Sequence, residues 1–441
     1  MVIIIGAGPA GISAAYHLYK AKKDFIILEK EKKIGGLCQS FELGGTYFDL
    51  GGHAFFSNDK YLDSLLNKVL SKPLYKQNRS AWVHSFNNYL KYPFQANLYN
   101  LPQNIIAECL IGLYDNLVTD EKSPPNNMLE WIYQSFGSGI AKHFMVPYNE
   151  KIWAFPLDKI VTNWAGDRIV QPNYKEIITG ALQSSNFDNY PNHIVSYPQN
   201  GGFEEMFQEF AKSFDMGKYL IHDEAREIDL KSKIIKLASG QHLNFDKIIS
   251  TLPLTHLVNC TKDIPQQYLD AASKLEHFSL YLVNIVINKP NISDKQRVYS
   301  ADPDVPFHKL VLNSNSSDFL RNKKVFSFQA EVSFSRYKKV NKDKLLEGVF
   351  KSLVEIGLVN KEEEPLACNI VELPYAYPIY TSDWKQSRET LFDYYHHNDI
   401  FCAGRFGEWL YINSDKAILR GMEAAAKVLD IKTEDLKRII L

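Results

Sequence analysis

Apolar residues at the start of the chain form a short run that breaks into a glycine-rich turn. Residues 2–5 are β-branched, and glycines follow at three positions: Gly6, Gly8 and Gly11. Small or apolar residues then recur at helical spacing: Ala10, Ala14 and Leu18. A second apolar run, 25–28, ends at the carboxylate of Glu29. This pattern predicts a strand, a tight turn, a helix and a second strand parallel to the first.

The same change from apolar strand to glycine turn occurs near the other end of the chain. Residues 400–402 are Ile-Phe-Cys, and Gly404 and Arg405 follow. An amphipathic helix over about 417–429 comes next, and Ser414 or Asp415 is expected to cap its N-terminus. Two such turns, almost a full chain apart, predict one ligand cradle that is built from both ends.

The first turn has the G-x-G-x-x-G spacing of dinucleotide-binding proteins. Its glycines permit a tight turn, close approach of the backbone to a pyrophosphate, and packing of the helix on the strand. Glu29 lies 18 positions after Gly11, where a carboxylate usually binds the ribose hydroxyl. The alternative is that the three glycines only shape a turn in a parallel sheet.

The two turns together predict bound FAD. A helix N-terminus under the ring system would stabilise the negative charge of a reduced flavin. Arg405 suits a diphosphate or a carboxylate, and its alternative is a surface ion pair. Further glycine pairs at 35–36 and 51–52 let the backbone approach a flat ligand closely. The expected FAD contacts are Gly6, Gly8, Pro9, Ala10, Gly11, Glu29, Lys30, Gly35, Gly36, Leu37, Cys38, Gly52, His53, Arg226, Glu227, Gly404, Arg405, Asn413, Ser414 and Asp415.

The middle of the chain alternates between helical and sheet-like patterns. A hairpin is expected at 81–93, followed by helices to about 190. Short strands return between 197 and 257, and longer ones follow at 280–287, 309–312 and 325–332 without intervening helices. We therefore predict an α/β fold in which a discontinuous Rossmann-type FAD-binding domain (1–80, 195–270 and 385–441) carries a helical substrate domain (81–194) and an antiparallel β-sheet substrate domain (271–384).

Composition narrows the class of protein. A chain of 441 residues with 45% hydrophobic content can bury a large core in two or three units. The net charge of −1 argues against nonspecific binding of nucleic acid, which needs a basic field. No run approaches the roughly 20 apolar residues of a membrane span, and the first strand leaves no room for a signal peptide, so we expect a cytoplasmic protein. Five widely spaced cysteines without a C-x-x-C pair fit reduced thiols better than disulfides or a zinc site.

Several segments, in the same order along the chain, resemble the UDP-galactopyranose mutase family, flavoenzymes of sugar-nucleotide metabolism. The most specific is 404–415, Gly-Arg-Phe-Gly-Glu-Trp-Leu-Tyr-Ile-Asn-Ser-Asp, which is similar to the family's C-terminal flavin motif. The others are the glycine-histidine loop at 51–57, the tyrosine-to-tryptophan segment at 144–153, the proline-glycine turn at 197–203 and the tyrosine-proline segment at 375–379. The resemblance covers nearly the whole chain.

The resemblance implies roles for individual residues. Arg168 and Arg405 would hold a substrate diphosphate, Tyr299 and Tyr411 would donate hydroxyl groups to it, and His53 would gate the cofactor. The remaining substrate contacts would be aromatic: Phe144, Tyr148, Trp153 and Tyr377. Core packing is the alternative for Phe144 and Trp153. For Arg168 it is a local ion pair or a helix cap, and for His53 an ordinary loop position.

The reaction implied by the resemblance interconverts UDP-hexopyranose and UDP-hexofuranose through a covalent adduct of reduced FAD and sugar. Side chains would then supply charge and position rather than a nucleophile. The chain has no second dinucleotide fingerprint for a nicotinamide, so an external electron donor is compatible with the sequence. A homodimer is equally compatible with it.

One segment departs from the family. Phe278 stands where the mutases carry an arginine near the reduced flavin, and His277 is the neighbour that would have to compensate. The strand at 280–287 and residues 302–307 are also similar to the wider group of amine oxidase and protoporphyrinogen oxidase-like flavoproteins. The alternative function is therefore an FAD-dependent oxidoreductase that removes hydride from an amine or a lipid-like substrate. A noncatalytic flavin-binding protein is the third hypothesis.

Overall fold

Five parallel strands form the sheet that contains the first residues of the chain. The computed structural model describes residues 1–119, 123–162, 164–165, 169–184 and 193–440. In spatial order the sheet consists of β19 (Ile400–Cys402), β13 (Lys247–Ser250), β1 (Val2–Ile5), β2 (Phe25–Leu28) and β9 (Leu220–Ile221). Segments from three distant parts of the sequence therefore share one sheet, and the carboxyl ends of its strands lie along one edge.

Both faces of the parallel sheet are covered, because successive side chains point to opposite faces. Val2 and Ile4 pack on one side, and Ile3 and Ile5 pack on the other. The first side carries α1 (Pro9–Lys20), α2 (Lys60–Val69), α7 (Glu205–Lys212), α13 (Ser414–Leu429) and α14 (Thr433–Ile440). The second carries α8 (Leu254–Cys260), α9 (Gln266–Ser273), α12 (Trp384–His397) and an antiparallel sheet of β10 (Ala225–Asp229), β11 (Ile234–Leu237) and β12 (His242–Asn244).

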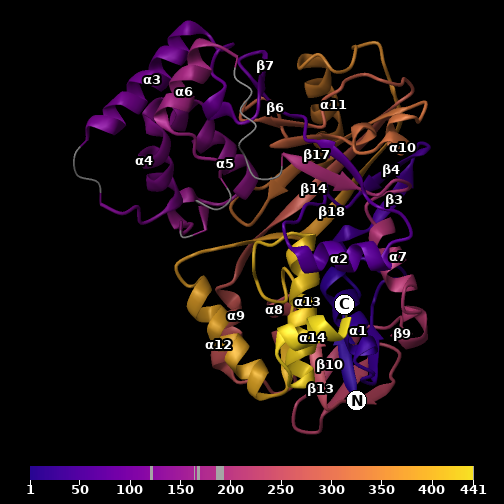
Figure 1. Cartoon of the computed structure of the whole chain (residues 1–441). Helices are drawn as coiled ribbons and strands as arrows, with labels where there is room; N and C mark the ends of the chain where they lie inside the picture. The colour runs from indigo at the N-terminus through magenta and orange to yellow at the C-terminus, as the bar shows by residue number, and fades with distance from the viewer. Residues whose placement is uncertain (120–122, 163, 166–168, 185–192, 441) are drawn as a thin grey trace.

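Helices α1 and α13 pack against each other although they come from opposite ends of the chain (Figure 1). The contact depends on Gly421, because a Cβ atom there would lie 2.0 Å from the carbonyl oxygen of Ala10. Gly421→Ala is expected to lower the free energy of unfolding by about 1–3 kcal/mol, since the helices must separate to admit the methyl group. Thermal unfolding measures this.

The matched control for Gly421→Ala is Gly348→Ala. Gly348 lies in α11 (Leu345–Glu355), where the nearest atom to an added Cβ is 3.9 Å away. That variant should keep its stability or gain up to about 1 kcal/mol, as alanine favours helix. Equal melting temperatures of the two variants would contradict a close α1–α13 contact.

A buried histidine makes the stability of this layer depend on pH. The side chain of His17 in α1 is fully buried; its Nδ1 and Nε2 lie 2.6 Å from the Ser13 carbonyl oxygen and the Tyr61 hydroxyl. Burial lowers the pKa of His17 to about 4. In the unfolded chain the imidazole of His17 takes up a proton with a pKa of about 6.5. The stabilising effect of the neutral, buried His17 is therefore complete above pH 6.5 and is lost as pH falls towards 4.

We expect a loss of about 2 kcal/mol of stability from His17 alone between pH 7.5 and pH 5. The drop in melting temperature over this interval should therefore be smaller in His17→Gln than in the wild type. The exposed His242 provides the control, and His242→Gln should melt like the wild type at both pH values. If His17→Gln and the wild type lose the same stability, the neutral buried histidine is refuted.

A second, seven-stranded sheet lies beyond the parallel one. In spatial order it consists of β18 (Pro365–Ile379), β14 (Glu276–Ile287), β17 (Phe326–Phe334), β16 (Lys309–Leu312), β15 (Arg297–Ser300), β6 (Ala81–Ser85) and β7 (Asn88–Lys91). Neighbouring strands are antiparallel except β15 and β6, which are parallel. Helices α10 (Asp318–Arg321) and α11 come from the connections of this sheet.

The helical part of the chain contains α3 (Gln103–Val118), α4 (Met128–Ile140), α5 (Val146–Trp153) and α6 (Tyr174–Leu182). The hairpin β6–β7, which we assigned to this part, instead forms the edge of the seven-stranded sheet, because β6 pairs with β15. Two small pairs complete the fold: β3 (Ser40–Leu43) with β4 (Thr46–Asp49), and β5 (Tyr75–Asn78) with β8 (Ile194–Tyr197).

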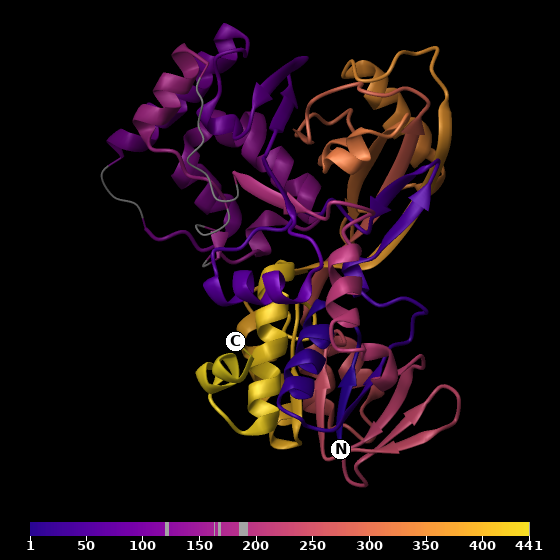
Figure 2. The same ribbon diagram turned by 45° about the vertical axis from the view of Figure 1, so that its right-hand side comes forward.

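The parts have a simple arrangement in space. In Figure 2 the helical cluster and the seven-stranded sheet stand side by side above the body that contains both chain ends. The predicted α/β class is confirmed, with a parallel sheet, a helical insertion and a largely antiparallel second sheet. The domain limits themselves stay a prediction. Of the described residues, none forms a helix that is long and apolar enough to cross a membrane.

Candidate functional site

The carboxyl ends of four parallel strands meet at one cavity, as expected for ligand sites of open α/β sheets. Gly6, Glu29, Thr251 and Gly404 follow β1, β2, β13 and β19 and line a cavity of about 900 Å³. Its opposite wall comes from the seven-stranded sheet and includes Tyr299. Both predicted glycine turns therefore face the same space.

Most of the predicted site residues line this cavity. They are Gly6, Gly8, Pro9, Ala10, Glu29, Lys30, Gly36, Leu37, Cys38, Gly52, His53, Tyr299, Tyr377, Gly404, Arg405, Tyr411, Asn413 and Ser414. Arg168 falls outside the described residues. The rest do not line the cavity: Gly11, Gly35, Arg226, Glu227, Asp415, Phe144, Tyr148 and Trp153.

Arg226 and Glu227 are absent from the cavity lining for a local reason. A register irregularity lies between Ala225 and Glu227, where β10 pairs with β11. The side chain of Arg226 turns outward, with 66% exposure, and forms an ion pair with Glu224 at 3.4 Å. The preceding residues Asp223, Glu224 and Ala225 line the cavity instead. The expected contact segment is thus displaced by about two residues.

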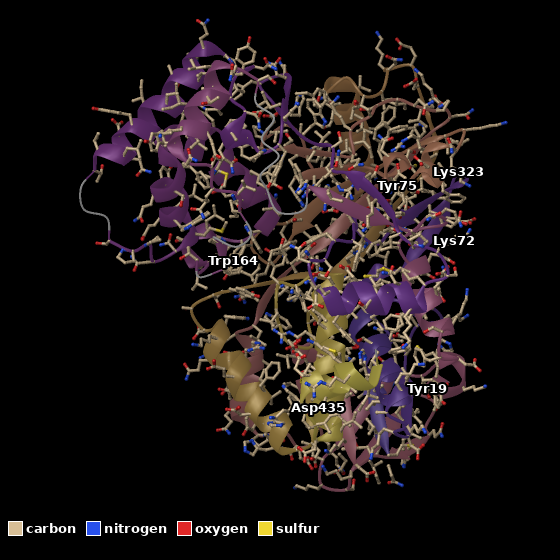
Figure 3. All side chains as sticks on the ribbon, in the orientation of Figure 1. Tyr19, Lys72, Tyr75, Trp164, Lys323 and Asp435 are labelled. Atoms are coloured by element: carbon tan, nitrogen blue, oxygen red, sulfur yellow. The ribbon has the colours of Figure 1, made fainter. Side chains whose placement is uncertain are left out.

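The predicted aromatic residues form a layer directly behind the wall. Tyr148 is edge-on to Tyr299, with ring centroids 6.0 Å apart, and stacks on Phe144 at 5.0 Å. Trp153 is edge-on to the cavity residue Tyr411 at 5.9 Å. Trp164, labelled at the lower edge of the helical cluster in Figure 3, packs against both Trp153 and Tyr411. The helical part therefore supports the cavity from behind.

The first glycine turn is shaped as a close cradle. Gly6 has φ +98°, and a Cβ atom there would lie 2.1 Å from the Thr251 hydroxyl oxygen. A Cβ on Gly11 would lie 1.9 Å from the Gly6 carbonyl oxygen, so Gly11 is needed for packing of α1 on the turn. Glu29 is buried, and its oxygens accept hydrogen bonds from the backbone N–H groups of Ala7 (2.7 Å) and Glu31 (3.0 Å). The carboxylate thus holds the turn from inside the cavity wall.

The second turn fixes Arg405 before any ligand binds. Its Nε donates to the carbonyl oxygen of Ile412 at 2.8 Å, and its Nη1 donates to that of Ala376 at 3.1 Å. The guanidinium also lies over the Tyr377 ring, 4.2 Å from the centroid. Helix α13 begins at Ser414 with Asn413 at the cap position, so the expected cap at Ser414 or Asp415 is wrong by one or two residues.

His53 lies in a loop whose backbone is hydrogen-bonded to buried charged side chains. Gly52 N–H donates to Glu331 Oε1 at 2.8 Å, and the His53 carbonyl accepts from Arg297 Nη2 at 2.9 Å. The imidazole stacks on Phe203 with centroids 4.9 Å apart. Burial and the nearby Arg405 lower the pKa of His53 to about 3, which keeps its ring neutral. Within the described part of the chain, its buried Nδ1 has no hydrogen-bond partner.

The charged residues that surround this loop were not predicted from the sequence. Tyr299, Lys309 and Glu331 lie opposite one another on the adjacent strands β15, β16 and β17. Lys309 Nζ is 2.7 Å from Glu331 Oε1, and both Lys309 and Arg297 line the cavity. In the sequence, the only local signal for these residues is a basic residue at an inward-facing position of a strand. That signal becomes informative only when the pairing of the strands is known.

Phe278 fills the position where the resemblance implies an arginine. It is buried, edge-on to Trp153 at 5.7 Å and stacked on Tyr377 at 5.5 Å. His277 stacks on Tyr375 at 4.5 Å, and burial lowers its pKa. The neutral His277 therefore does not restore the charge that is missing at Phe278.

These features fit a flavin dinucleotide. Both glycine turns and His53 line the cavity, Glu29 presents a buried carboxylate there, and the buried Nδ1 of His53 has no hydrogen-bond partner among the described residues. Residues at the first turn would hold the pyrophosphate and ribose, and those at 404–414 and 52–53 would hold the ring system.

A family comparison agrees with this geometry. The profile described as flavin containing amine oxidoreductase matches residues 9–429. The chain belongs to this family. Membership implies a flavin cofactor. Among curated relatives, a probable flavin-containing monoamine oxidase A of Dictyostelium discoideum is 29% identical over 116 residues, and a putrescine oxidase of Kocuria rosea is 24% identical over 121. Each of these matches covers 25% of the relative and 26% or 27% of this chain.

Solved structures show more extensive similarity. The crystal structure of a reduced UDP-galactopyranose mutase matches 100% of this chain and 98% of its own, with a TM-score of 0.93 and 28% identity. A putative protoporphyrinogen oxidase from Exiguobacterium matches 97% of this chain and 98% of its own, with a TM-score of 0.74 and 15% identity, and so shows the shared fold. The resemblance to the mutases and to the wider group of flavoproteins is confirmed.

Proposed function

We propose that this protein is an FAD-dependent enzyme of nucleotide-sugar metabolism that interconverts UDP-hexopyranose and UDP-hexofuranose. The likeness to a UDP-galactopyranose mutase over the whole chain carries this proposal. The relatives that are oxidases match about a quarter of the chain, so they bear mainly on the cofactor.

Reduced FAD, when bound, supplies the nucleophilic nitrogen for exchange at the anomeric carbon. The chain's own groups provide position and charge. Arg405 is held by two carbonyl oxygens and a ring face, so its remaining donors are already oriented for a diphosphate. Tyr299 and Tyr411, which both line the cavity, would add hydroxyl donors.

Aromatic side chains would keep water away from the reacting sugar. Tyr377 and Tyr411 line the cavity with ring centroids 4.9 Å apart, and Trp153 and Trp164 close the layer behind Tyr411. Exclusion of water favours recapture of the diphosphate over hydrolysis. The neutral ring of His53 lines the same space without adding a charge that would compete with Arg405.

The test uses FAD-loaded protein reduced with dithionite and mixed with UDP-galactopyranose. Chromatography should detect formation of UDP-galactofuranose, and oxidised protein should be inactive in the same assay. UDP should also bind to the reduced protein in a titration. Reduced protein that neither binds UDP nor interconverts the two ring forms would refute the proposal.

Phe278 favours a second candidate function, net oxidation of a substrate. Without a cation at that position, one stabilising charge for an anionic reduced flavin is lost, because Phe278 is buried among aromatic side chains. An enzyme of this type bleaches its flavin when substrate is added without any reductant. Screening amines anaerobically at about 450 nm tests this candidate independently of sugar nucleotides.

A further inference from the structure

Charges are unevenly distributed around the cavity. Carboxylates gather where the first glycine turn and β10 meet: Glu29, Glu31, Asp223 and Glu224. Basic residues and tyrosines gather at the wall formed with the seven-stranded sheet: Arg79, Arg297, Lys309, Arg405, Tyr92, Tyr299, Tyr377 and Tyr411. The second group suits an anion that lies beyond the dinucleotide.

Two of these basic residues are engaged in the frame of the site. Lys309 is paired with the buried Glu331 at 2.7 Å. Arg297 is itself buried, and its two terminal nitrogens donate to the carbonyl oxygens of Gln296 and His53. Both residues therefore bind the protein's own groups as well as lining the cavity, and so does Arg405.

Arg79 is placed by contacts from three parts of the chain. It follows β5, and its backbone N–H donates to the carbonyl oxygen of His193 at 2.7 Å. Its Nη2 donates to the hydroxyl oxygen of Tyr299 at 2.5 Å. Its guanidinium lies 5.7 Å from the centroid of the Tyr92 ring. Since Arg79, Tyr92 and Tyr299 all line the cavity, this cluster faces the ligand space.

The surroundings of Tyr299 show that this wall favours negative charge. Burial alone would raise the pKa of its hydroxyl, but Arg79, Lys309 and Arg297 outweigh burial and lower it. Tyr148 packs behind this cluster, with its ring edge-on to that of Tyr299 at 6.0 Å between centroids. Arg79, Tyr299, Tyr411 and Arg405 all line the same cavity.

We propose that Arg79, held by Tyr299, is a residue that binds the substrate diphosphate together with Arg405. This inference rests on the proposed function, because the diphosphate belongs to a nucleotide-sugar substrate. A planar fork of donors is well suited to a diphosphate.

The test compares three probes on FAD-loaded, dithionite-reduced protein: UDP, uridine and inorganic pyrophosphate. Arg79→Gln should weaken binding of UDP and pyrophosphate by about 10- to 100-fold, the usual range for losing a charged hydrogen-bonding partner. Uridine has no phosphate, so its binding should stay unchanged. Arg79→Lys keeps the charge without the fork, and its loss should be smaller.

The matched control is Arg438→Gln. The side chain of Arg438 is 82% exposed in α14, and it should leave binding of all three probes unchanged. Equal UDP affinity in wild type and Arg79→Gln would overturn the inference, as would an equal loss for uridine, which indicates a general structural defect. Flavin absorbance and melting temperature verify that each variant is folded and loaded.

A measurement on the wild type covers the case in which the variants fail to fold. Phenylglyoxal modifies arginine, and pyrophosphate should protect the peptide that contains Arg79 from this reagent. Modification of that peptide at the same rate with and without saturating pyrophosphate would overturn the inference. Wild-type protein that does not bind pyrophosphate would overturn it as well.

Failure of this inference can be distinguished from failure of the proposed function. Ring interconversion by a wild type whose UDP binding does not depend on Arg79 refutes the role of Arg79 alone. The opposite outcome is also distinguishable. The protein could bind pyrophosphate through Arg79, yet neither bind UDP more tightly than pyrophosphate nor convert UDP-sugars. That result refutes the proposed substrate and leaves Arg79 as part of an anion-binding site.

Discussion

Arg405→Gln is expected to lower kcat/KM for the proposed ring interconversion by about 10²- to 10³-fold, the usual effect of removing one preorganised charge-stabilising donor. The guanidinium is fixed by the carbonyl oxygens of Ile412 and Ala376 and by the ring of Tyr377, so a ligand need not pay to orient it. Arg405→Lys should recover part of the activity because it keeps the charge. Steady-state kinetics with a saturating reductant measures both variants.

Arg388→Gln is the matched control for Arg405. Arg388 also donates through Nε to a carbonyl oxygen, that of Glu408 at 2.6 Å, and its guanidinium lies 4.3 Å from the centroid of Phe392, but it does not line the cavity. Its substitution should lower the melting temperature while kcat/KM changes little. A comparable loss of activity in both variants would attribute the effect to stability rather than to the site.

Glu331→Gln is expected to cost about 3–5 kcal/mol of unfolding free energy, the range found when one partner of a buried ion pair is removed. Glu331 is 3% exposed and lies 2.7 Å from Lys309 Nζ and 3.5 Å from His308 Nε2. Burial raises the pKa of Glu331, but Lys309 and His308 outweigh this and hold it below its ordinary value. Glutamine would leave the partly buried Lys309 without its counter-charge.

The control for Glu331 is Glu355→Gln. Glu355 pairs with Lys351 at 3.6 Å on the exposed side of α11, where such pairs contribute about 0.5 kcal/mol or less. Chemical unfolding with urea compares the two variants. If Glu331→Gln is no less stable than Glu355→Gln, the buried charge network does not stabilise the loop at Gly52.

Local chemistry explains why the two glycine turns that line the cavity could be located from the sequence. The glycine turns at 6–11 and 404–405 depend on backbone conformation and close contacts within short segments, which residue identity reveals directly. The strand patterns at 280–287 and 309–312 likewise depend on alternating burial and were confirmed as parts of β14 and β16. Strand β18 was missed because Pro374 and Pro378 interrupt its pattern.

The substrate side was less predictable because it depends on pairing between distant strands. Arg79 meets Tyr299 only because β6 pairs with β15, which aligns Ala81 with Arg297. No local pattern fixes that pairing. The depth of a residue behind the cavity wall was also hard to predict. Phe144, Tyr148 and Trp153 were expected to contact the substrate, yet they lie one layer behind the wall. Residue type predicts burial but does not distinguish a wall from the layer that supports it.

The strand order of the parallel sheet has a consequence for the newly synthesised chain. Strand β1 occupies the centre, but its neighbour β13 and the next strand β19 appear only about 245 and 400 residues later. At typical rates of 5–20 residues per second, the first apolar strand waits roughly 20–80 s for the sheet to be completed. We expect the emerging N-terminal segment to depend on chaperones during that interval, and pulse-labelled nascent chains should remain sensitive to protease until β19 has left the ribosome.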